Sequence, residues 1–439
     1  MAKKIQYRSM DVEQVRVAQV LAQFPEGSRV VVGIDVAKRN FVAALCDESN
    51  ETRLRVHFEH PRQTLEFVDL LNEVREQGCT VEAVMEPTGT YGDPLRYQLG
   101  IRSIPVFRVT NKHVADAAEV FDGCPSKHDN KDASVIAWLH GNKRSKLWLE
   151  VEPERRAVRA LVARRELYDG PMRKVITQME PILARHFPEF EQFFDLSRRK
   201  TPHRLLEHFG SPSALAKAGE AKVSELIQKF SRKKPEEAFV HELVQAAHST
   251  TGTGMHKDEI QLVRLMAGEV LRLMELRAGV DKLIEEAMQE IPSTAAMRTC
   301  VGAVTAAVVF AYLGDPRNYG SAAAYEKAAG LNLVESSSGT NPKARDEVVR
   351  RISKRGPGIV RKYLFLAAMR LVQKDRVSKA WYQRRRGFVA EQRTKAIIAV
   401  ERKLCRALFH VAKGQPFDAN RLFDARRLGL ETPVCTEAT

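Results

Sequence analysis

The segment Arg29–Asn40, RVVVGIDVAKRN, constrains the fold of this chain more than any other stretch. Val30, Val31 and Val32 are β-branched residues, which favour a strand. The run is apolar on both faces, as is typical of a central strand that is covered on both sides. Asp35 lies in the same segment, where a buried carboxylate is costly unless something pairs with it. From this strand alone two interpretations stay open: Asp35 caps a turn, or it binds a metal ion.

The segments that follow predict a mixed α/β domain. Further strands are expected at residues 41–46, 54–59, 80–86 and 103–109, and helices at 65–76, 93–99, 111–120 and 127–138. Three strands in an antiparallel meander, followed by alternating helices and strands, are typical of the ribonuclease-H-like (RuvC-like) fold. We therefore expect this fold over residues 29–148, after an N-terminal extension at 1–28 with a helix at 12–24.

Four carboxylates occupy positions that this fold brings together. They are Asp35 in the first strand, Glu86 at the end of the fourth strand, and Asp129 and Asp132 in the last helix. The last two are three residues apart and share a helical face. Gathered carboxylates repel one another without a cation, and oxygen ligands suit Mg²⁺ or Mn²⁺. Each acid alone has a simpler explanation, but together they predict a metal site that acts on a phosphodiester.

The positive charge of the chain is concentrated in one segment. The net charge is +15, and residues 340–411 hold 20 Lys and Arg but only 5 Asp and Glu. Such an excess indicates a surface that binds a polyanion. No apolar run approaches the roughly 18 residues that a membrane span needs. We expect no membrane association and, from the lack of a signal peptide and the scattered cysteines, a cytoplasmic protein.

The second half of the chain is expected to be helical. In residues 149–290, Met266, Leu273, Val280 and Ala287 recur every seven residues, with Leu276 and Leu283 completing an apolar seam. Two interpretations are open: a coiled-coil arm that joins protomers, or a helix that packs on residues 154–188 of the same chain. Residues 291–411 are expected to form another compact, mainly helical domain with a basic tail, and residues 412–439 a poorly ordered end.

Several blocks resemble one family. GIDVAKRNF, MEPTGTYGDPL, NKHVADAAEVF and KHDNKDA, and later VGAVTAAVVFAYLGDPRNY, AAGLNLVESSSG and RRISKRGPGIVRKYL, are similar to the DEDD-type insertion-sequence transposases, the group that includes the Piv invertases. The resemblance covers about residues 29–375 in the order of the family. It implies that Asp35, Glu86, Asp129 and Asp132 bind Mg²⁺ or Mn²⁺ in a RuvC-like domain.

The resemblance also implies an unusual recombination chemistry. A serine before a glycine in the C-terminal transposase domain forms a covalent phosphoserine–DNA intermediate; here it is Ser338, with Ser337 as the alternative register. A structured bridge RNA guides the enzyme to double-stranded donor and target DNA in a bacterial cytoplasm. Strand exchange needs several active sites at once, which implies a homo-oligomer, a dimer that pairs into a tetramer.

The basic residues are expected to bind the nucleic acid. Because no histidine lies near Ser338 in the sequence, the acidic metal cluster is the expected activator of its hydroxyl. The expected nucleic-acid-binding residues are Arg350, Arg351, Lys354, Arg355, Arg361, Lys362, Arg384, Arg385 and Arg386. The alternatives are a metal-dependent RuvC-like junction endonuclease without a covalent intermediate, or a non-catalytic nucleic-acid-binding protein.

Overall fold

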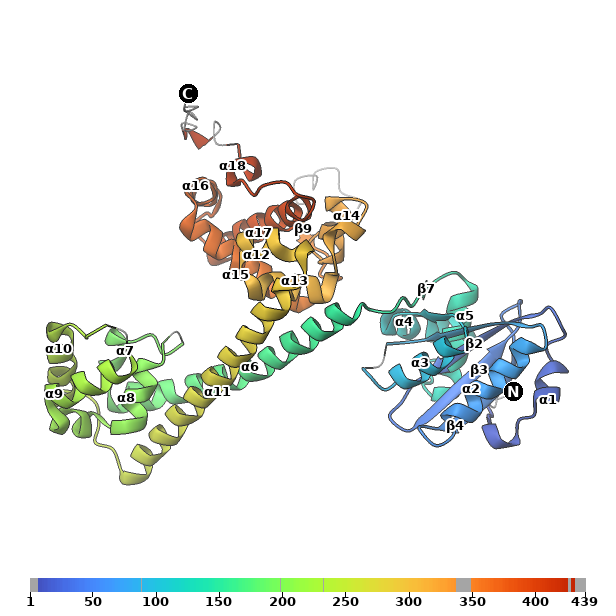
Figure 1. The fold of residues 1–439 in the computed structure, drawn as a ribbon, viewed down its shortest axis with the longest axis horizontal. Helices are drawn as coiled ribbons and strands as arrows, with labels where there is room; N and C mark the ends of the chain where they lie inside the picture. Colours follow the sequence, from blue (N-terminus) through green and yellow to red (C-terminus); the bar gives the residue numbers. More distant parts are fainter. Residues whose placement is uncertain are drawn as a thin grey trace. The chain divides into compact units, whose positions relative to one another are not determined.

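The computed structural model describes residues 7–87, 89–197, 199–231, 233–336, 349–424 and 428–430. The chain divides into two compact units, Met1–Glu150 and Val151–Thr439, and Figure 1 shows a sheet with helices in the first and mainly helices in the second. Within the described residues, none of the helices combines the length and the apolar character needed to cross a bilayer.

A seven-stranded sheet organises the first unit. Its spatial order is β1-β4-β3-β2-β5-β6-β7. The strands are β1 (Met10–Asp11), β2 (Arg29–Asp35), β3 (Asn40–Cys46), β4 (Thr52–Glu59), β5 (Thr80–Met85), β6 (Val106–Arg108) and β7 (Lys146–Leu147). β2, β3 and β4 form an antiparallel meander, while β5 runs parallel to β2 and β6 parallel to β5. The predicted α/β order is therefore confirmed, whereas the edge strands β1 and β7 carried too few residues to be predicted.

Helices cover both faces of this sheet. They are α1 (Val17–Leu21), α2 (Thr64–Glu76), α3 (Asp93–Ile101), α4 (Asn111–Asp122) and α5 (Asp129–Gly141). Alternate residues of β2 point to opposite faces: Val30 and Val32 belong to the core under α1, α2 and α3, and Val31 to the core under α4 and α5. The doubly apolar pattern of β2 thus reflects burial on two sides.

The N-terminal segment belongs to this unit. The prediction of one helix over residues 12–24 is wrong. The segment instead forms a short 3-10 turn (Val12–Gln14) followed by the five-residue helix α1. β1 pairs in parallel with β4, and Val20 and Phe24 are buried in the core. The segment therefore completes the sheet domain instead of standing apart as an extension.

Two long helices organise the second unit: α6 (Pro153–His186) and α11 (Lys257–Gln289), which pack along each other (Figure 1). Ion pairs join them, from Arg165 Nε to Asp281 Oδ1 at 2.5 Å and from Arg277 Nη1 to Asp169 Oδ1 at 3.0 Å. Pairing of α11 with the helix at 154–188 of the same chain is therefore confirmed.

The face of α11 that packs inward overlaps the predicted heptad seam only in part. Val280 is buried, and Met266, Leu273 and Ala287 pack against the apolar cores of this unit. Leu276 and Leu283 are 40% and 50% exposed. Partner helices bury the residues that face them, and heptad spacing alone does not identify that face.

Separate apolar clusters lie along the helix pair. One contains residues of α7 (Phe190–Phe193), α8 (Thr201–Phe209), α9 (Pro212–Phe230) and α10 (Glu237–His248). The other contains residues of α12 (Ala295–Val301), α13 (Ala303–Leu313), α14 (Ala322–Ala328), α15 (Gly358–Lys374), α16 (Arg376–Arg385) and α17 (Ala390–Ala412). Residues near the short α18 (Ala419–Leu422) also pack here: Phe423 is buried and its ring lies 4.7 Å from that of Trp381. The tail expected to be poorly ordered thus contributes to the core at this position.

Candidate metal centre and nucleic-acid interface

Strand register brings Asp35 and Glu86 to one edge of the sheet. Asp35 is the last residue of β2, and Glu86 directly follows β5. The two strands run parallel with Ile34 opposite Met85. Asp35 and Glu86, the next residue of each strand, therefore lie side by side where the two strands end. Both residues are half-buried.

Gly33 brings the helix with the other two acids onto this strand. A Cβ atom at Gly33 would lie 2.2 Å from the carbonyl oxygen of Ala133 and 2.5 Å from the backbone nitrogen of Ala137. Only glycine permits this approach of α5 to β2. Because Asp35 lies two residues beyond Gly33 on the same face of β2, the first turn of α5, with Asp129 and Asp132, comes near the Asp35 carboxyl.

Three of the predicted acids act electrostatically on the fourth, Asp35. Burial raises the pKa of Asp35 to about 7, and three neighbouring carboxylates add to the rise. In order of effect these neighbours are Asp129, Asp132 and Glu86. The pKa of Asp132 is also raised, mainly by burial, although Lys127 opposes the shift. All four predicted acids therefore belong to one electrostatic cluster.

The donor set of this cluster suits a hard cation. Carboxylate oxygens are the ligands that Mg²⁺ and Mn²⁺ prefer, and a cation would relieve the repulsion at Asp35. Among the described residues, however, no three Asp, Glu, His or Cys side chains converge closely enough to hold one ion. The acids fit such an ion by their chemistry and by their positions in the fold.

A buried lysine, which the sequence reasoning missed, holds the start of α5. Lys131 is fully buried, and its Nζ donates to Asp122 Oδ1 at 2.7 Å and to the carbonyl of Cys124 at 2.6 Å. Tyr7 also donates to Asp122, at 2.6 Å, and these bonds lower the pKa of Asp122 to about 2. The available signal was helical geometry: Lys131 lies two residues from Asp129 and therefore on the opposite side of α5.

The predicted nucleophiles Ser337 and Ser338 lie outside the described residues. The strand before them, β8 (Leu333–Ser336), pairs antiparallel with β9 (Val349–Ile352), and Arg350 belongs to β9.

The expected phosphate-binding residues divide into two groups. Arg361 donates from Nη1 to the carbonyls of Ala329 and Gly356, at 3.2 and 2.7 Å, and Lys362 pairs with Glu166 at 2.6 Å. These two side chains stabilise the fold of the second unit. Six others are exposed: Arg351, Lys354, Arg355 and, around the end of α16, Arg384, Arg385 and Arg386.

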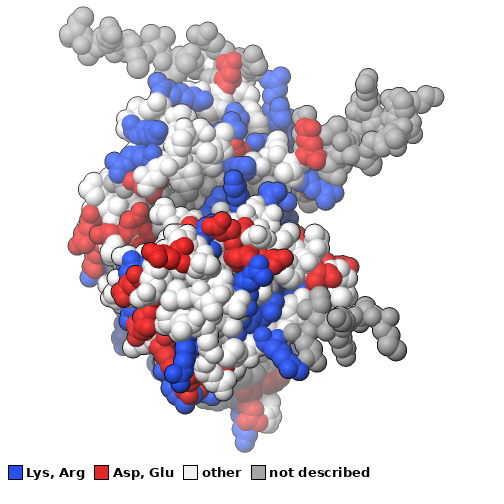
Figure 2. Space-filling view, turned by 90° about the vertical axis from the view of Figure 1, so that its right-hand side faces the viewer, with Lys and Arg blue, Asp and Glu red and all other residues white. Residues whose placement is uncertain are grey.

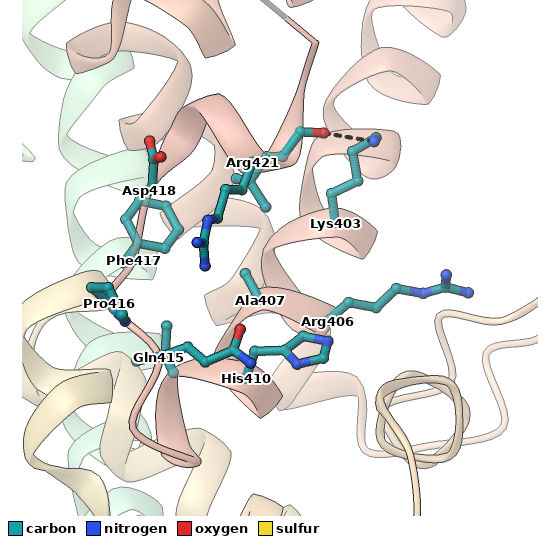
Figure 3. A pocket seen from close by; sticks show the side chains of 11 residues that line it. Lys403, Arg406, Ala407, His410, Gln415, Pro416, Phe417, Asp418 and Arg421 are labelled. Atoms are coloured by element: carbon teal, nitrogen blue, oxygen red, sulfur yellow. Dashed lines mark hydrogen bonds between the residues drawn. The ribbon is translucent and has the colours of Figure 1, made fainter.

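A basic cavity lies beside α17, and the sequence reasoning did not find it. It has a volume of about 260 Å³, and its lining includes Lys403, Arg406, His410 and Arg421. Figure 3 shows Arg421 extending into the space between Phe417 and Ala407. Burial lowers the pKa of Lys403, and the like charges of Arg385 and Arg406 lower it further. Positive charge is therefore crowded here.

The first unit has a different charge distribution. On the face drawn at the front of Figure 2, acidic and basic side chains are interspersed. The basic excess of the sequence belongs to residues 340–411. Polyanion binding is thus expected from the second unit, and acid-dependent chemistry from the first.

Two models of known protein families match separate parts of the chain. A family model described as "Transposase" matches residues 32–188, and one described as "Transposase IS116/IS110/IS902 family" matches residues 298–383. The chain is therefore a DNA transposase. It carries both transposase domains of the IS110/IS116 family of insertion elements.

Two relatives extend the similarity beyond the separate domains. The "Insertion element IS110 uncharacterized 43.6 kDa protein" of Streptomyces coelicolor is 25% identical over 321 residues, which cover 70% of this chain and 75% of the relative. The "Insertion element IS116 uncharacterized 44.8 kDa protein" of Streptomyces clavuligerus is 25% identical over 366 residues, which cover 82% of this chain and 88% of the relative.

Proposed function

We propose that this transposase cleaves and exchanges DNA strands through a RuvC-like acidic centre and a serine nucleophile. The observation that carries the proposal is the electrostatic cluster at the edge of β2 and β5, where neighbouring carboxylates help to raise the pKa of Asp35 to about 7. Acids placed so that they repel one another are typical of a site that works with a cation.

Asp35, Glu86, Asp129 and Asp132 would hold the ion. Bound Mg²⁺ or Mn²⁺ would supply charge neutralisation and orientation at a phosphodiester. The buried Lys131–Asp122 pair fixes the first turn of α5 and so keeps Asp129 and Asp132 facing the strand edge. Gly33 sets the distance between that turn and β2.

Ser338 is the proposed nucleophile, with Ser337 as the alternative. Its hydroxyl oxygen would attack the phosphorus atom, one oxygen of the DNA backbone would leave, and the proton would pass to a base of the assembled site. A phosphoserine ester retains the energy of the broken phosphodiester, so the new strand can be joined without ATP. A free hydroxyl is a poor nucleophile, which is why we assign its activation to the acidic metal centre.

The proposed partners follow from charge and from an unpartnered apolar stripe. Residues 340–411 contain 20 basic and 5 acidic residues. This positive charge supports binding of donor DNA, of target DNA and of a structured bridge RNA in the cytoplasm. Four exposed leucines follow one face of α11, at spacings of 3, 11 and 7 residues; they are Leu262, Leu265, Leu276 and Leu283. A second copy that covers this stripe would form the dimer, and two dimers the tetramer, that strand exchange requires.

A covalent-trapping experiment tests the proposal. The protein is incubated with bridge RNA, Mg²⁺ and end-labelled DNA that is nicked near the exchange site, so that the cleaved strand diffuses away. We expect a labelled protein band on a denaturing gel, and peptide mapping should locate the adduct at Ser338. Ser338→Ala should lose both adduct and recombinant product, Asp35→Asn should lose cleavage, and Ser337→Ala should have a milder effect.

The opposite result favours the other enzymatic interpretation. Free 5′-phosphate ends without an adduct, together with full cleavage by Ser338→Ala, would identify a metal-dependent junction endonuclease that uses water. Cleavage by Asp35→Asn at the wild-type rate would remove the acidic centre from the mechanism.

A further inference from the structure

The turn between α16 and α17 carries an unusually exposed aromatic residue. The side chain of Phe388 is 95% exposed, the largest value among the described large apolar residues. Its neighbour Val389 is 59% exposed. Isolated apolar residues are common on protein surfaces, so the surroundings of Phe388 decide whether its exposure has a function.

The turn holds its tip in a defined conformation. The Phe388 N–H donates to Gln392 Oε1 at 3.2 Å, and Arg393 Nη2 donates to the Phe388 carbonyl at 3.0 Å. Gly387 has a φ of +56°, which glycine adopts readily, and a Cβ there would lie 1.9 Å from Gln392 Oε1. The backbone of Phe388 is thus bound on both sides while its ring faces solvent.

The tip is surrounded by cations. Arg384, Arg385 and Arg386 precede it, and Arg393 and Lys395 follow in the first turns of α17. The one acid in residues 376–400, Glu391, pairs with Lys395 at 2.7 Å.

Positive charge also extends beyond the turn. The pKa of Glu391 is lowered mainly by Lys395 and additionally by Arg351 of β9. Arg385 lowers the pKa of Lys403, which lines the basic cavity. Phe388 therefore projects from a surface rich in basic side chains.

We propose that Phe388 stacks on an unpaired base of a single-stranded nucleic acid whose phosphates are bound by the surrounding arginines. The inference rests on the proposed nucleic-acid function of residues 340–411 and adds a residue and a substrate form to it. An aromatic ring among cations is the usual arrangement for binding single strands, because every base has a stacking face and every nucleotide a phosphate.

Two other partners fit this tip less well. A duplex would have to be unstacked before a ring could enter it, whereas an unpaired base is already available, and strand exchange produces such bases. A second copy of the same tip would bring like charges together. A single-stranded polynucleotide is the partner that satisfies both the ring and the charges.

Binding measurements on the full-length protein test this inference. The probes are a fluorescein-labelled mixed-sequence DNA of about 20 nucleotides and the matching perfect duplex. Phe388→Ala should weaken single-strand binding by about 5- to 100-fold, with little change in duplex binding or in the slope of log affinity against log salt. Phe388→Trp should retain the wild-type affinity, and Val389→Ala, the neighbouring control, should change it by less than about 2-fold.

Photocrosslinking supplies an independent readout. A strand with 5-iodouracil at successive positions should crosslink to Phe388 in the wild-type protein, and peptide mapping identifies the residue. Unchanged thermal unfolding of Phe388→Ala would exclude a folding defect, as expected for a side chain that is 95% exposed.

The results that contradict each proposal differ. Unchanged single-strand affinity in Phe388→Ala, equal losses on strand and duplex, or crosslinks only to other residues would overturn the stacking role. A loss of binding to phosphatidylserine vesicles without a loss on DNA would assign Phe388 to membranes and overturn it as well. Independently, changing Arg384, Arg385 and Arg386 together to Gln should flatten the salt slope; an unchanged slope would contradict the proposed nucleic-acid function of this segment.

Discussion

At the scale of single residues, Asp35 illustrates how tertiary surroundings change the chemistry of a side chain. Its carboxyl ends a central strand, is half-buried, and lies near three other carboxylates, so its pKa is raised to about 7 from a usual value near 3.9. The same residue in an unfolded chain ionises at its usual value. Folding and protonation of Asp35 are therefore linked.

The linkage predicts how pH affects the metal-free protein. Between about pH 4 and pH 7 the Asp35 carboxyl binds more protons in the folded state than in the unfolded state, so its contribution to the free energy of unfolding should fall as pH rises through this window and level off above it. The slope should be at most about 1.4 kcal/mol per pH unit. Chemical denaturation of the wild type and of Asp35→Asn in EDTA at several pH values measures this contribution as the difference between the two slopes, and the variant should have the less negative slope. Equal slopes in the two proteins would show that Asp35 does not have the raised pKa.

At the scale of elements, close packing between α5 and β2 determines where the acids lie. Periodicity predicted both elements, but nothing local in RVVVGID indicated that Gly33 would touch the backbone of a helix about 100 residues further along. Small residues on both sides, Gly33 on the strand and Ala133 and Ala137 on the helix, allow this contact.

Substitution of Gly33 should therefore disturb the site more than the local sequence suggests. In Gly33→Val, the side chain would meet backbone atoms of α5 that cannot move without displacing the helix, at a cost of about 1–3 kcal/mol or more. Thermal unfolding and DNA cleavage should both be impaired. Gly100→Ala is the matched control in the same unit, because a Cβ at Gly100 meets nothing within 4 Å. Equal stability of both variants would mean that α5 packs differently.

Assembly also belongs to the scale of elements. The apolar stripe of α11 is exposed in the single chain. Leu276→Asp together with Leu283→Asp should therefore lower the molecular mass measured by light scattering and leave thermal unfolding nearly unchanged. Val280→Asp should instead unfold the second unit, because Val280 is buried in its core. Leu65→Asp, on the exposed surface of α2, is the control. If the double variant keeps the wild-type mass, protomers associate through another surface.

At the scale of the whole molecule, the two units have separate cores and carry different chemistry. Acidic clustering belongs to Met1–Glu150 and the basic excess to Val151–Thr439. Units with their own cores often unfold as separate steps. We expect calorimetry of the full chain to resolve two transitions.

A divalent metal ion should raise the midpoint of only one of these two unfolding transitions. Mg²⁺ at millimolar concentration should raise the midpoint of the transition that belongs to the first unit, because a ligand that binds only the folded state stabilises it. Asp35→Asn should remove most of this shift, and the other transition should not move. A shift of both transitions, or one that persists in Asp35→Asn, would place the metal site elsewhere.

The sequence by itself determined the order of strands and helices in the sheet domain, the four acids of the electrostatic cluster and the basic segment. These follow from local residue patterns and composition. Tertiary structure decided how far each prediction applied: only part of the heptad seam of α11 packs inward, and Arg361 and Lys362 form bonds within the protein. The tertiary structure also pairs Lys131 with Asp122 and leaves the Phe388 ring exposed to solvent. The physical reason is that burial and pairing depend on partners distant in the sequence, whereas periodicity reports only which faces a helix or strand has available.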